Sequence, residues 1–441
     1  MKRKTLNFII RQNGGETGFF ARVGKKRLII GTSVILGVVL LGGVYLWYVN
    51  NYVNARKVAL EPVKQIEYEW ISDAADSGIV KDYLWSRTKE LMLKNAKDDV
   101  LIVEKVTLPG KLLEQTQEES GTYKLYDQAL LLKCYVREGD RIKAMALIKE
   151  VDGRFDYASE SIGAKVAYLD AFLNYYSAFG SKNDEKKINN MVAELFDENG
   201  LLKTTKITVR TYEGQAYVYS SDTEAALTTG NATGDLEAGD SDIDEKDIPK
   251  TTIEGVFLSN VDLKLIKELE NNGYLPQGSY EKNLAIVKGG LISNDIPLYA
   301  LCYSMNGETA EYVYTSGAVG TINVSESVET SLNLALVNEL PSASYSWIKS
   351  TLYGTEIFSN SLKLTSGRTE GDESFDSYLK IAQMAIVLDD RDTFDLCARR
   401  IGSQIATLDT SHALSMIFRS EGGRNVTYAR DNLQMNLLLK E

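Results

Sequence analysis

Apolar residues recur at helical spacing along most of the chain after residue 66, starting with SGIVKDYLWSRTKELMLKN at residues 77–95. An apolar side chain at every third or fourth position lines one face of a helix, and that face packs against a core. Four such faces are Leu125, Ala129, Leu132 and Val136; Val166, Leu169, Leu173 and Tyr176; Tyr378, Ile381, Ala385 and Leu388; and Cys397, Ile401, Ile405 and Leu408. The pattern predicts a mainly α-helical protein.

The predicted helices come in pairs joined by short polar turns. In LLLKCYVREGDRIKAMALIKEV, residues 130–151, a Glu-Gly-Asp turn ends one helix and the next helix follows at once. Further pairs are predicted at residues 164–196, 260–300, 326–351 and 374–408. Six such hairpins would close into an (α/α)6 toroid. An open solenoid of helix pairs is the alternative, but the chain shows no fixed repeat period to support it.

Two neighbouring regions depart from the helical pattern. Residues 201–220 alternate between apolar and polar positions and predict a β-hairpin inserted between helices. Residues 221–250 are rich in Asp, Glu, Gly, Ser and Thr and predict a flexible acidic loop. Within this loop Asp240, Asp242 and Asp244 have the spacing of a calcium-binding loop, but the glycine and the final glutamate of such a loop are replaced. We therefore expect a solvated acidic loop without a metal.

Residues 28–49, LIIGTSVILGVVLLGGVYLWYV, form an uncharged apolar run long enough to cross the roughly 30 Å hydrocarbon core as a helix. Eight basic residues and a single acid, Glu16, precede this run, and positively charged flanks stay on the cytoplasmic side. We predict a cytoplasmic tail at 1–27, a signal anchor at 28–49, a spacer at 50–66 and an extracellular domain at 67–441. A cleaved signal peptide is the alternative, but the run is longer than the hydrophobic region of such a peptide.

The charge balance of the predicted extracellular part excludes nucleic acid as a partner. Of the 49 basic and 61 acidic residues in the chain, eight and one lie in the tail, which leaves 41 basic and 60 acidic residues outside. Affinity for nucleic acid depends on Lys and Arg neutralising phosphates, so a surface this acidic is unsuited to it.

Cysteine and histidine usage limits the chemistry further. Cys134, Cys302 and Cys397 are odd in number and far apart, so they do not form a disulfide framework. Cys134 and Cys397 occupy apolar helical positions and are predicted to be buried free thiols. The single histidine, His412, cannot supply a zinc cluster or an HExxH metalloprotease. No phosphate-binding or dinucleotide motif occurs in the external part, and we expect no cofactor or metal.

Paired carboxylates are the remaining source of catalysis. Glycoside hydrolysis uses a protonated acid that donates to the leaving oxygen and an ionised partner, about 6.5 to 9.5 Å away in inverting enzymes, that activates water. The 25 tyrosines could line a sugar cleft, since their rings stack on sugar faces. Glu118 and Glu119 open the stretch EESGTYKLYDQALLLKCYVREGD at residues 118–140, although acids at the start of a helix are also favourable charges without any catalytic role.

The stretch at residues 118–140 resembles the segment around the catalytic acid in glycoside hydrolase family 8, a family of endoglucanases and related enzymes with an (α/α)6 toroid. INVSESVETSLNLALVNEL at 322–340, YSWIKSTLYGTEIF at 345–358 and DESFDSYLKIAQMAIVLDDRD at 372–392 resemble further segments of that family. The resemblance covers most of residues 77–408 and is greatest to membrane-attached members encoded beside polysaccharide synthases in Gram-positive bacteria.

The resemblance implies roles for five residues. Glu119 would be the general acid, and Tyr123 would contact sugar one turn further along the same helix. Glu326 would stand where the family has an aspartate and would be the base or a sugar ligand. Glu373 and Tyr378 would line or support the substrate cleft.

Two departures from the family pattern put hydrolysis in doubt. In ESIGAKVAYLDAF, Ala164 and Lys165 replace the paired aspartates that bind the sugar at the cleaved bond, and Phe375 and Asp376 replace a Pro-Ala pair. Loss of the aspartates implies reduced or absent hydrolysis. A catalytically degenerate protein that binds glycan or a synthase subunit during assembly and secretion is therefore the second hypothesis. A helical-repeat adaptor without a glycan role is the third.

Taken together, the sequence predicts a mainly α protein, an (α/α)6 toroid with a small β-hairpin insertion, preceded by one transmembrane helix. The first hypothesis for its function is a membrane-anchored extracellular glycoside hydrolase that cleaves or edits a β-linked exopolysaccharide during synthesis or export, by an inverting mechanism. The expected partners are a β-glucan or related polysaccharide, a membrane polysaccharide synthase, and the membrane itself through one helix.

Overall fold

The computed structural model describes residues 37–53, 55, 57–62, 81–93, 100–107, 118–119, 122–212, 215–218, 250–307, 309–316, 321–354, 357–364, 366–406, 413–421 and 424–439. The chain divides into two compact units, one formed by residues 1–56 with 180–185 and the other by residues 57–179 with 186–441. Each unit is described by itself.

In the first unit, residues 37–48 form an α-helix that continues into the π-helix Val49–Val53. Its large apolar side chains are exposed, among them Leu41, Leu46 and Trp47. Among the described residues no helix is both long and apolar enough to cross a membrane, and residues 28–36 of the predicted span lie outside that part. The signal anchor therefore stays a prediction.

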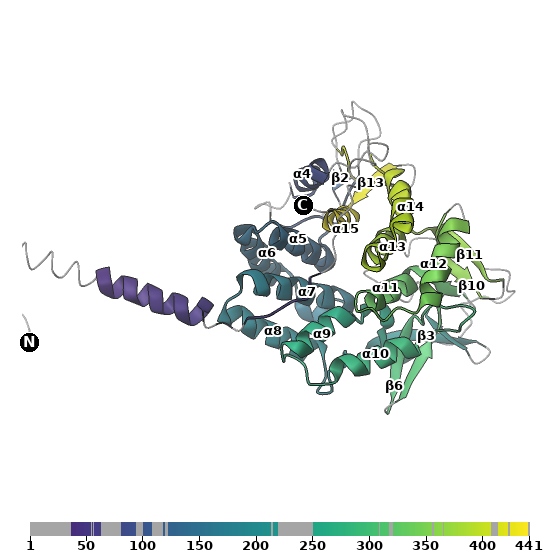
Figure 1. The fold of residues 1–441 in the computed structure, drawn as a ribbon, viewed down its shortest axis with the longest axis horizontal. Coiled ribbons are helices and arrows are strands. Elements are labelled where there is room, and N and C mark those ends of the chain that lie inside the picture. The colour runs from purple at the N-terminus through teal and green to yellow at the C-terminus, as the bar shows by residue number, and fades with distance from the viewer. Residues whose placement is uncertain are drawn as a thin grey trace, which may run out of the picture. The chain divides into compact units, whose positions relative to one another are not determined.

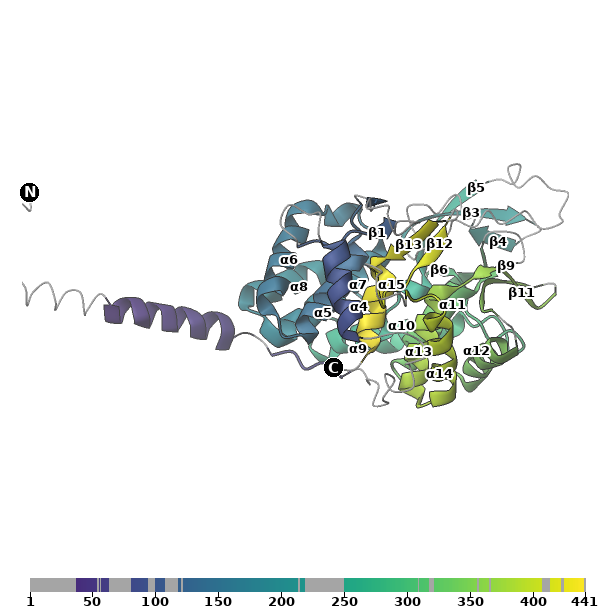
Figure 2. The same ribbon diagram turned by 90° about the horizontal axis from the view of Figure 1, so that it is seen from above.

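In the second unit, two rings of helices surround a common centre (Figures 1 and 2). The inner ring consists, in the described part of the chain, of α5 Leu125–Arg137, α7 Ile162–Phe179, α9 Leu263–Asn271, α11 Val324–Ala335, α13 Phe375–Leu388 and α15 Ala429–Leu438. The outer ring consists of α4 Lys81–Met92, α6 Arg141–Arg154, the part of α8 Lys182–Leu195 from residue 186 on, α10 Ser279–Gly289, α12 Ser342–Gly354 and α14 Arg391–Gly402. The prediction of a mainly helical fold built from helix pairs is confirmed.

The predicted turn between α5 and α6 shows how the sequence ends one helix and starts the next. Gly139 adopts a left-handed conformation with φ 70°, and the Asp140 carboxylate accepts a hydrogen bond from the Lys143 N–H at 3.0 Å. Glycine tolerates positive φ, and an N-cap aspartate satisfies an otherwise unpaired helix N–H. The chain can therefore reverse direction within a few residues.

The helix predicted from the apolar face of Cys397, Ile401, Ile405 and Leu408 is too long. Helix α14 ends at Gly402, and Ile405 pairs with Ile417 in an isolated β-bridge, while Leu408 lies outside the described residues. The apolar residues continue at helical spacing beyond Gly402, but Ile405 is buried through its pairing with Ile417 and not as part of a further helical turn.

Short strands lie on one side of the helices (Figure 2). They form a sheet ordered β12-β13-β1-β2, a sheet ordered β11-β10-β9 and a sheet ordered β7-β6-β5-β3-β4-β8. Their bounds are β1 Lys105–Thr107, β2 Glu118–Glu119, β3 Thr205–Tyr212, β4 Gln215–Val218, β5 Lys250–Phe257, β6 Cys302–Asn306, β7 Thr309–Val313, β8 Thr315–Ser316, β9 Thr321–Asn323, β10 Ser359–Lys363, β11 Arg368–Glu373, β12 Arg419–Glu421 and β13 Arg424–Tyr428. The predicted hairpin is confirmed as β3 and β4, but it belongs to a larger sheet that the sequence did not indicate.

Strands β9, β11 and β13 lead directly, or after one residue, into α11, α13 and α15. The strands therefore lie at the N-terminal ends of the inner helices. We call this end of the ring the rim, meaning the first turns of the inner helices and the residues that lead into them.

Most of the predicted acidic loop, residues 221–249, lies outside the described residues, and so does His412. The free-thiol prediction is confirmed, because Cys134 on α5, Cys302 on β6 and Cys397 on α14 are all buried and unpaired.

Many of the tyrosines belong to the core rather than to a surface. Tyr135, Tyr168, Tyr299, Tyr303 and Tyr378 are among the largest fully buried side chains.

Part of the predicted spacer belongs to the second unit. The Ser177 hydroxyl donates to the Val58 carbonyl at 3.0 Å, and the Asn272 amide donates to the Ala59 carbonyl at 3.1 Å. These contacts attach residues 57–62 to α7 and to the end of α9.

Candidate active site

The rim brings together residues that lie far apart in the sequence. The Ser325 hydroxyl on α11 lies 2.6 Å from the Ser374 hydroxyl at the start of α13, which in turn lies 2.7 Å from that of Ser377. Because both helices meet at their first turns, they run parallel, as neighbouring inner helices of a toroid do. Acidic residues placed just before or within these first turns therefore converge on one end of the ring.

Glu118 and Glu119 form strand β2 and pair with Thr107 and Val106 of β1. The predicted placement of Glu119 on the same helix as Tyr123 is wrong, because α5 begins only at Leu125. The extended conformation is held by backbone pairing with β1, a partner that the sequence around Glu119 does not reveal. The backbone of Glu119 nevertheless precedes an inner helix, as expected for a residue of the rim.

Tyr123 lies between β2 and α5 and is half-buried against the core. The Arg154 guanidinium lies 5.9 Å from the centre of its ring. Its predicted contact with sugar stays a prediction.

Glu326 lies in the first turn of α11, where its N–H donates to the Asn323 side chain at 3.1 Å. Its side chain is only 4% exposed. Its charge is also one of those that raise the pKa of Lys380 on α13. Glu326 thus faces the interior of the ring more than the solvent, and its predicted role as base or sugar ligand stays a prediction.

Glu373 and Tyr378 form a linked pair at the start of α13. The buried Tyr378 hydroxyl donates to Glu373 Oε1 at 2.7 Å and accepts from the Phe358 N–H at 2.9 Å. Burial is the main cause of the raised pKa of Tyr378, and the Glu373 hydrogen bond raises it further, so the phenol stays protonated. The tyrosine holds the exposed Glu373 carboxylate in place from the core side, while the substrate contacts predicted for both residues stay untested.

Ala164 and Lys165, which replace the family's aspartate pair, lie near the start of α7. Ala164 is 1% exposed, and Lys165 is 6% exposed. The Lys165 ammonium contacts Glu194 Oε1 at 2.9 Å and the Ala158 carbonyl at 3.1 Å. This lysine therefore connects the inner ring to α8 of the outer ring.

Glu160 is a rim acid that the sequence analysis did not single out. It follows the 3-10 helix Tyr157–Ser159 and stands two residues before α7. Burial raises the pKa of its carboxyl, against the lowering effect of Lys124 and Lys165. A raised pKa makes the ionised form of a carboxyl a stronger proton acceptor. The signal that could have found it is its position just before an inner helix, the same as that of Glu119.

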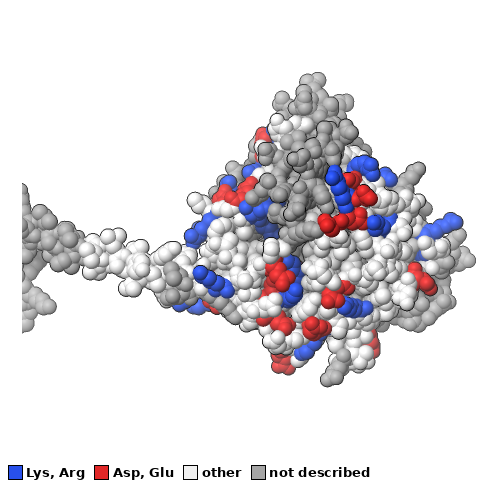
Figure 3. Space-filling model, viewed as in Figure 1, with Lys and Arg blue, Asp and Glu red and all other residues white. Residues whose placement is uncertain are grey.

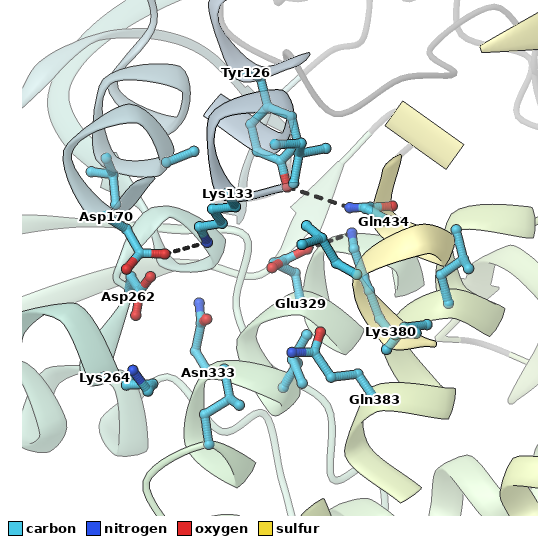
Figure 4. Close-up of a pocket in the computed structure, with 18 of the residues that line it drawn as sticks. Tyr126, Lys133, Asp170, Asp262, Lys264, Glu329, Asn333, Lys380, Gln383 and Gln434 are labelled. Carbon is cyan, nitrogen blue, oxygen red and sulfur yellow. Dashed lines mark hydrogen bonds and ion pairs between the residues drawn. The ribbon is translucent and has the colours of Figure 1, made fainter. Parts of the chain in front are cut away.

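Below the rim, the inner helices enclose a cavity of about 470 Å³, which we call the lumen pocket (Figure 4). Its charged lining residues are Lys133, Arg137, Asp170, Asp262, Lys264, Glu329 and Lys380. None of the five rim residues predicted from the sequence lines this pocket. The structure therefore separates two polar regions, of which the sequence indicated only one.

Two ion pairs in the lumen pocket join neighbouring helices. Lys133 on α5 contacts Asp170 on α7, and Lys380 on α13 lies 2.6 Å from Glu329 on α11 (Figure 4). Burial and the nearby Asp170 carboxylate raise the pKa of Asp262 to about 6. The attractive pairs fix the relative positions of adjacent inner helices, because each ammonium would otherwise be left buried without a counter-charge.

No protein-family model matches the sequence, and no curated protein sequence matches it. Among solved structures, an α-amylase from Clostridium perfringens matches with a TM-score of 0.53 at 16% identity, over 80% of this chain and 97% of that one. PssZ from Listeria monocytogenes matches with a TM-score of 0.48 at 10% identity, over 80% and 94% of the two chains. The endo-β-1,4-glucanase CMCax from Acetobacter xylinum matches with a TM-score of 0.44 at 9% identity, over 74% and 98%. The match to the α-amylase shows that the second unit has the fold of six-hairpin glycosidases.

Proposed function

We propose that the chain is a membrane-anchored extracellular glycoside hydrolase that cleaves or edits a β-linked exopolysaccharide at the rim during its synthesis or export. The observation that carries the proposal is the gathering of acids at the starts of different inner helices: Glu119 before α5, Glu160 before α7, Glu326 on α11 and Glu373 before α13. Glycoside hydrolysis requires carboxyl groups from two sides of the scissile bond, and parallel inner helices can supply them.

In the proposed reaction, the protonated Glu119 carboxyl donates its proton to the glycosidic oxygen as the bond from that oxygen to the anomeric carbon breaks. Water attacks the anomeric carbon from the opposite face, which inverts the configuration at that carbon. The proton of the water passes to an ionised carboxylate, the base. Glu326 is the first candidate for this base. Glu160 is the second, because it is more exposed than Glu326 and makes no ion pair within the described residues.

The proposed location rests on the apolar run at 28–49 and on the exposed apolar side chains of its described part, residues 37–48. A tether at the membrane would raise the effective concentration of the hydrolase where a synthase releases its chain, without any new contact. A membrane polysaccharide synthase is therefore the partner that we propose.

The test is release of reducing ends from a panel of β-glucans, amino-polysaccharides and, because of the α-amylase fold neighbour, α-glucans. The full-length chain should release reducing ends, Glu119→Gln should reduce the rate by about 100-fold or more, and Glu118→Gln should serve as the neighbouring control with little effect. NMR of the fresh product should show inverted anomeric configuration. Equal activity of Glu119→Gln, or retained configuration, would overturn the assignment.

A catalytically degenerate glycan-binding or synthase-accessory protein is the second candidate. It is supported by Ala164 and Lys165, since the first is buried and the second is engaged with Glu194. In that case no panel member is cleaved, while the wild-type chain and Glu119→Gln bind the same glycan with equal affinity.

A further inference from the structure

We infer that Asp127, in the first turn of α5, is a further catalytic residue of the rim. Positive charge develops on the anomeric carbon as a glycosidic bond breaks. The ionised Asp127 carboxylate stabilises this charge without forming a bond to the sugar, so the attack of water still inverts the configuration. The inference rests on the proposed function, in which Glu119 remains the proton donor and Glu326 or Glu160 the base.

The Asp127 side chain is buried without a partner. It is 3% exposed, and its carboxylate makes no hydrogen bond or ion pair within the described residues. Such a group is rare in folded proteins, because the free energy lost on leaving water is not recovered by a hydrogen bond. A carboxylate held in this way is suited to a site where a positive charge appears only during a reaction.

Two other acids at the starts of inner helices do have partners. Asp431 in the first turn of α15 accepts hydrogen bonds from the Arg419 guanidinium at 2.8 and 2.6 Å. Asp376 in the first turn of α13 contacts the Lys380 ammonium. On the surface of the molecule, several acidic side chains also lie beside basic ones (Figure 3). Asp127 therefore differs from the acids that hold neighbouring elements together.

The charges that face Asp127 oppose one another. Burial is the largest cause that raises the pKa of Asp127, to about 7. Arg430 on α15 and Lys124 before α5 lower this pKa, whereas Glu104 before β1 and Asp431 on α15 raise it. A positive charge on a nearby sugar would favour the ionised form, and its effect is strongest where water is excluded. The transition state would thus supply the counter-charge that the protein does not.

The position of Asp127 directs its side chain to the rim. Side chains of a helix tilt towards its N-terminus, so a first-turn residue points to the end of the ring where the inner helices start. Helix α5 contacts α7 and α15, whereas α11 contacts α9 and α13 (Figure 1). Asp127 and Glu326 are each the third residue of their helix, on opposite sides of the ring. The neighbouring helix α7 has no acid in its first turn that could replace Asp127.

Steady-state cleavage by the full-length chain tests this role. Asp127→Asn keeps the size of the side chain and removes its charge, so kcat should fall about 100-fold while KM changes less than about threefold. Because the ionised form is the active one, wild-type activity should rise as the pH increases through about 7, and Asp127→Asn should lack this rise.

Asp262→Asn is the matched control. Burial also raises the pKa of Asp262, but its carboxylate caps α9 by accepting from the Leu265 N–H at 2.9 Å. Asparagine can cap a helix as well, so this variant should keep the wild-type kcat.

A second measurement does not depend on hydrolysis. Isofagomine is an imino sugar that carries a positive charge in place of the anomeric carbon, and glucose is a neutral sugar of similar size. Isothermal titration calorimetry should show that the wild-type chain binds isofagomine at least about tenfold more tightly than glucose. In Asp127→Asn the two affinities should become equal within about threefold, because the carboxylate that recognises the charge is absent.

Three results would overturn the inference: wild-type kcat in Asp127→Asn, equal affinity of Asp127→Asn and the wild type for isofagomine, or no preference of the wild type for isofagomine over glucose. Thermal melting checks that each variant is folded. If the wild type cleaves no glycan, the proposed function fails, and the isofagomine comparison alone then decides whether Asp127 stabilises a positive charge.

Discussion

The rim and the lumen pocket both carry acidic residues, but Glu160 and Glu373 at the rim are held differently from Asp170 and Glu329 in the lumen pocket. At the rim, Glu160 makes no ion pair within the described residues, and the Glu373 carboxylate is held by the neutral Tyr378 hydroxyl. In the lumen pocket, Asp170 and Glu329 each face a lysine. A neighbouring ammonium favours the ionised form of a carboxyl, and an acid without an ion pair lacks that effect. The difference makes Glu160 a candidate for proton transfer and gives Asp170 and Glu329 a structural role.

The largest expected effect comes from breaking a buried charge cluster. Lys380 is 5% exposed and contacts both Glu329 and Asp376. Lys380→Met leaves the buried Asp376 carboxylate and the half-buried Glu329 carboxylate without their ammonium. This should lower the free energy of unfolding by about 3 to 5 kcal/mol in urea denaturation.

The matched control for this variant is Lys349→Met on the outer ring. Lys349 lies 2.5 Å from Asp390, but its side chain is 37% exposed. An ion pair this accessible to water contributes at most about 1 kcal/mol. Equal losses in the two variants would contradict the view that lumen charges fix the inner ring.

The next effect concerns catalysis at the rim. If Glu160 is the base, Glu160→Gln should lower kcat by about 100-fold, or about 2.7 kcal/mol of transition-state stabilisation, while the melting temperature stays within a few degrees of wild type. Glu326→Gln, measured beside it, separates the two candidates. Full activity in Glu160→Gln together with a large loss in Glu326→Gln would show that Glu326 on α11 is the base.

Asp127 is a buried acid at the rim. It lies in the first turn of α5, is 3% exposed, and has its pKa raised to about 7, chiefly by burial. A raised folded-state pKa means that the ionised form is disfavoured, so stability should rise as the pH falls from about 8 through 7 towards 4.

Asp127→Asn removes this titration. The variant should gain at least about 1 kcal/mol relative to wild type at pH 8.5, and the gain should shrink at pH 5, where both side chains are neutral in the fold. Melting temperatures across this pH range measure the effect. A constant difference at every pH would show that the carboxyl is ionised throughout.

The sequence predicted the helical pairs because each helix buries one apolar stripe, and that pattern is local. It also placed Glu326 at a helix start and Glu373 just before one, as the structure has them. It did not identify the lumen pairs, since Lys133 and Asp170, or Glu329 and Lys380, look like ordinary helix charges until the ring brings them together. It misplaced Glu119 for the same reason, because the β1 strand that pairs with β2 has only three residues.

The smallest expected effect comes from Asp140, which lies outside the rim and the lumen pocket and serves as a reference for the other variants. Asp140 caps α6 on the outer ring by accepting the Lys143 N–H, and Asp140→Ala should lower the free energy of unfolding by about 1 kcal/mol. Glycan cleavage should be unchanged, because α6 is an outer helix and contributes no residue to the rim. A loss of cleavage in this variant, measured well below its melting temperature, would mean that the outer ring positions the rim acids. Rim activity could then no longer be separated from the packing of the toroid.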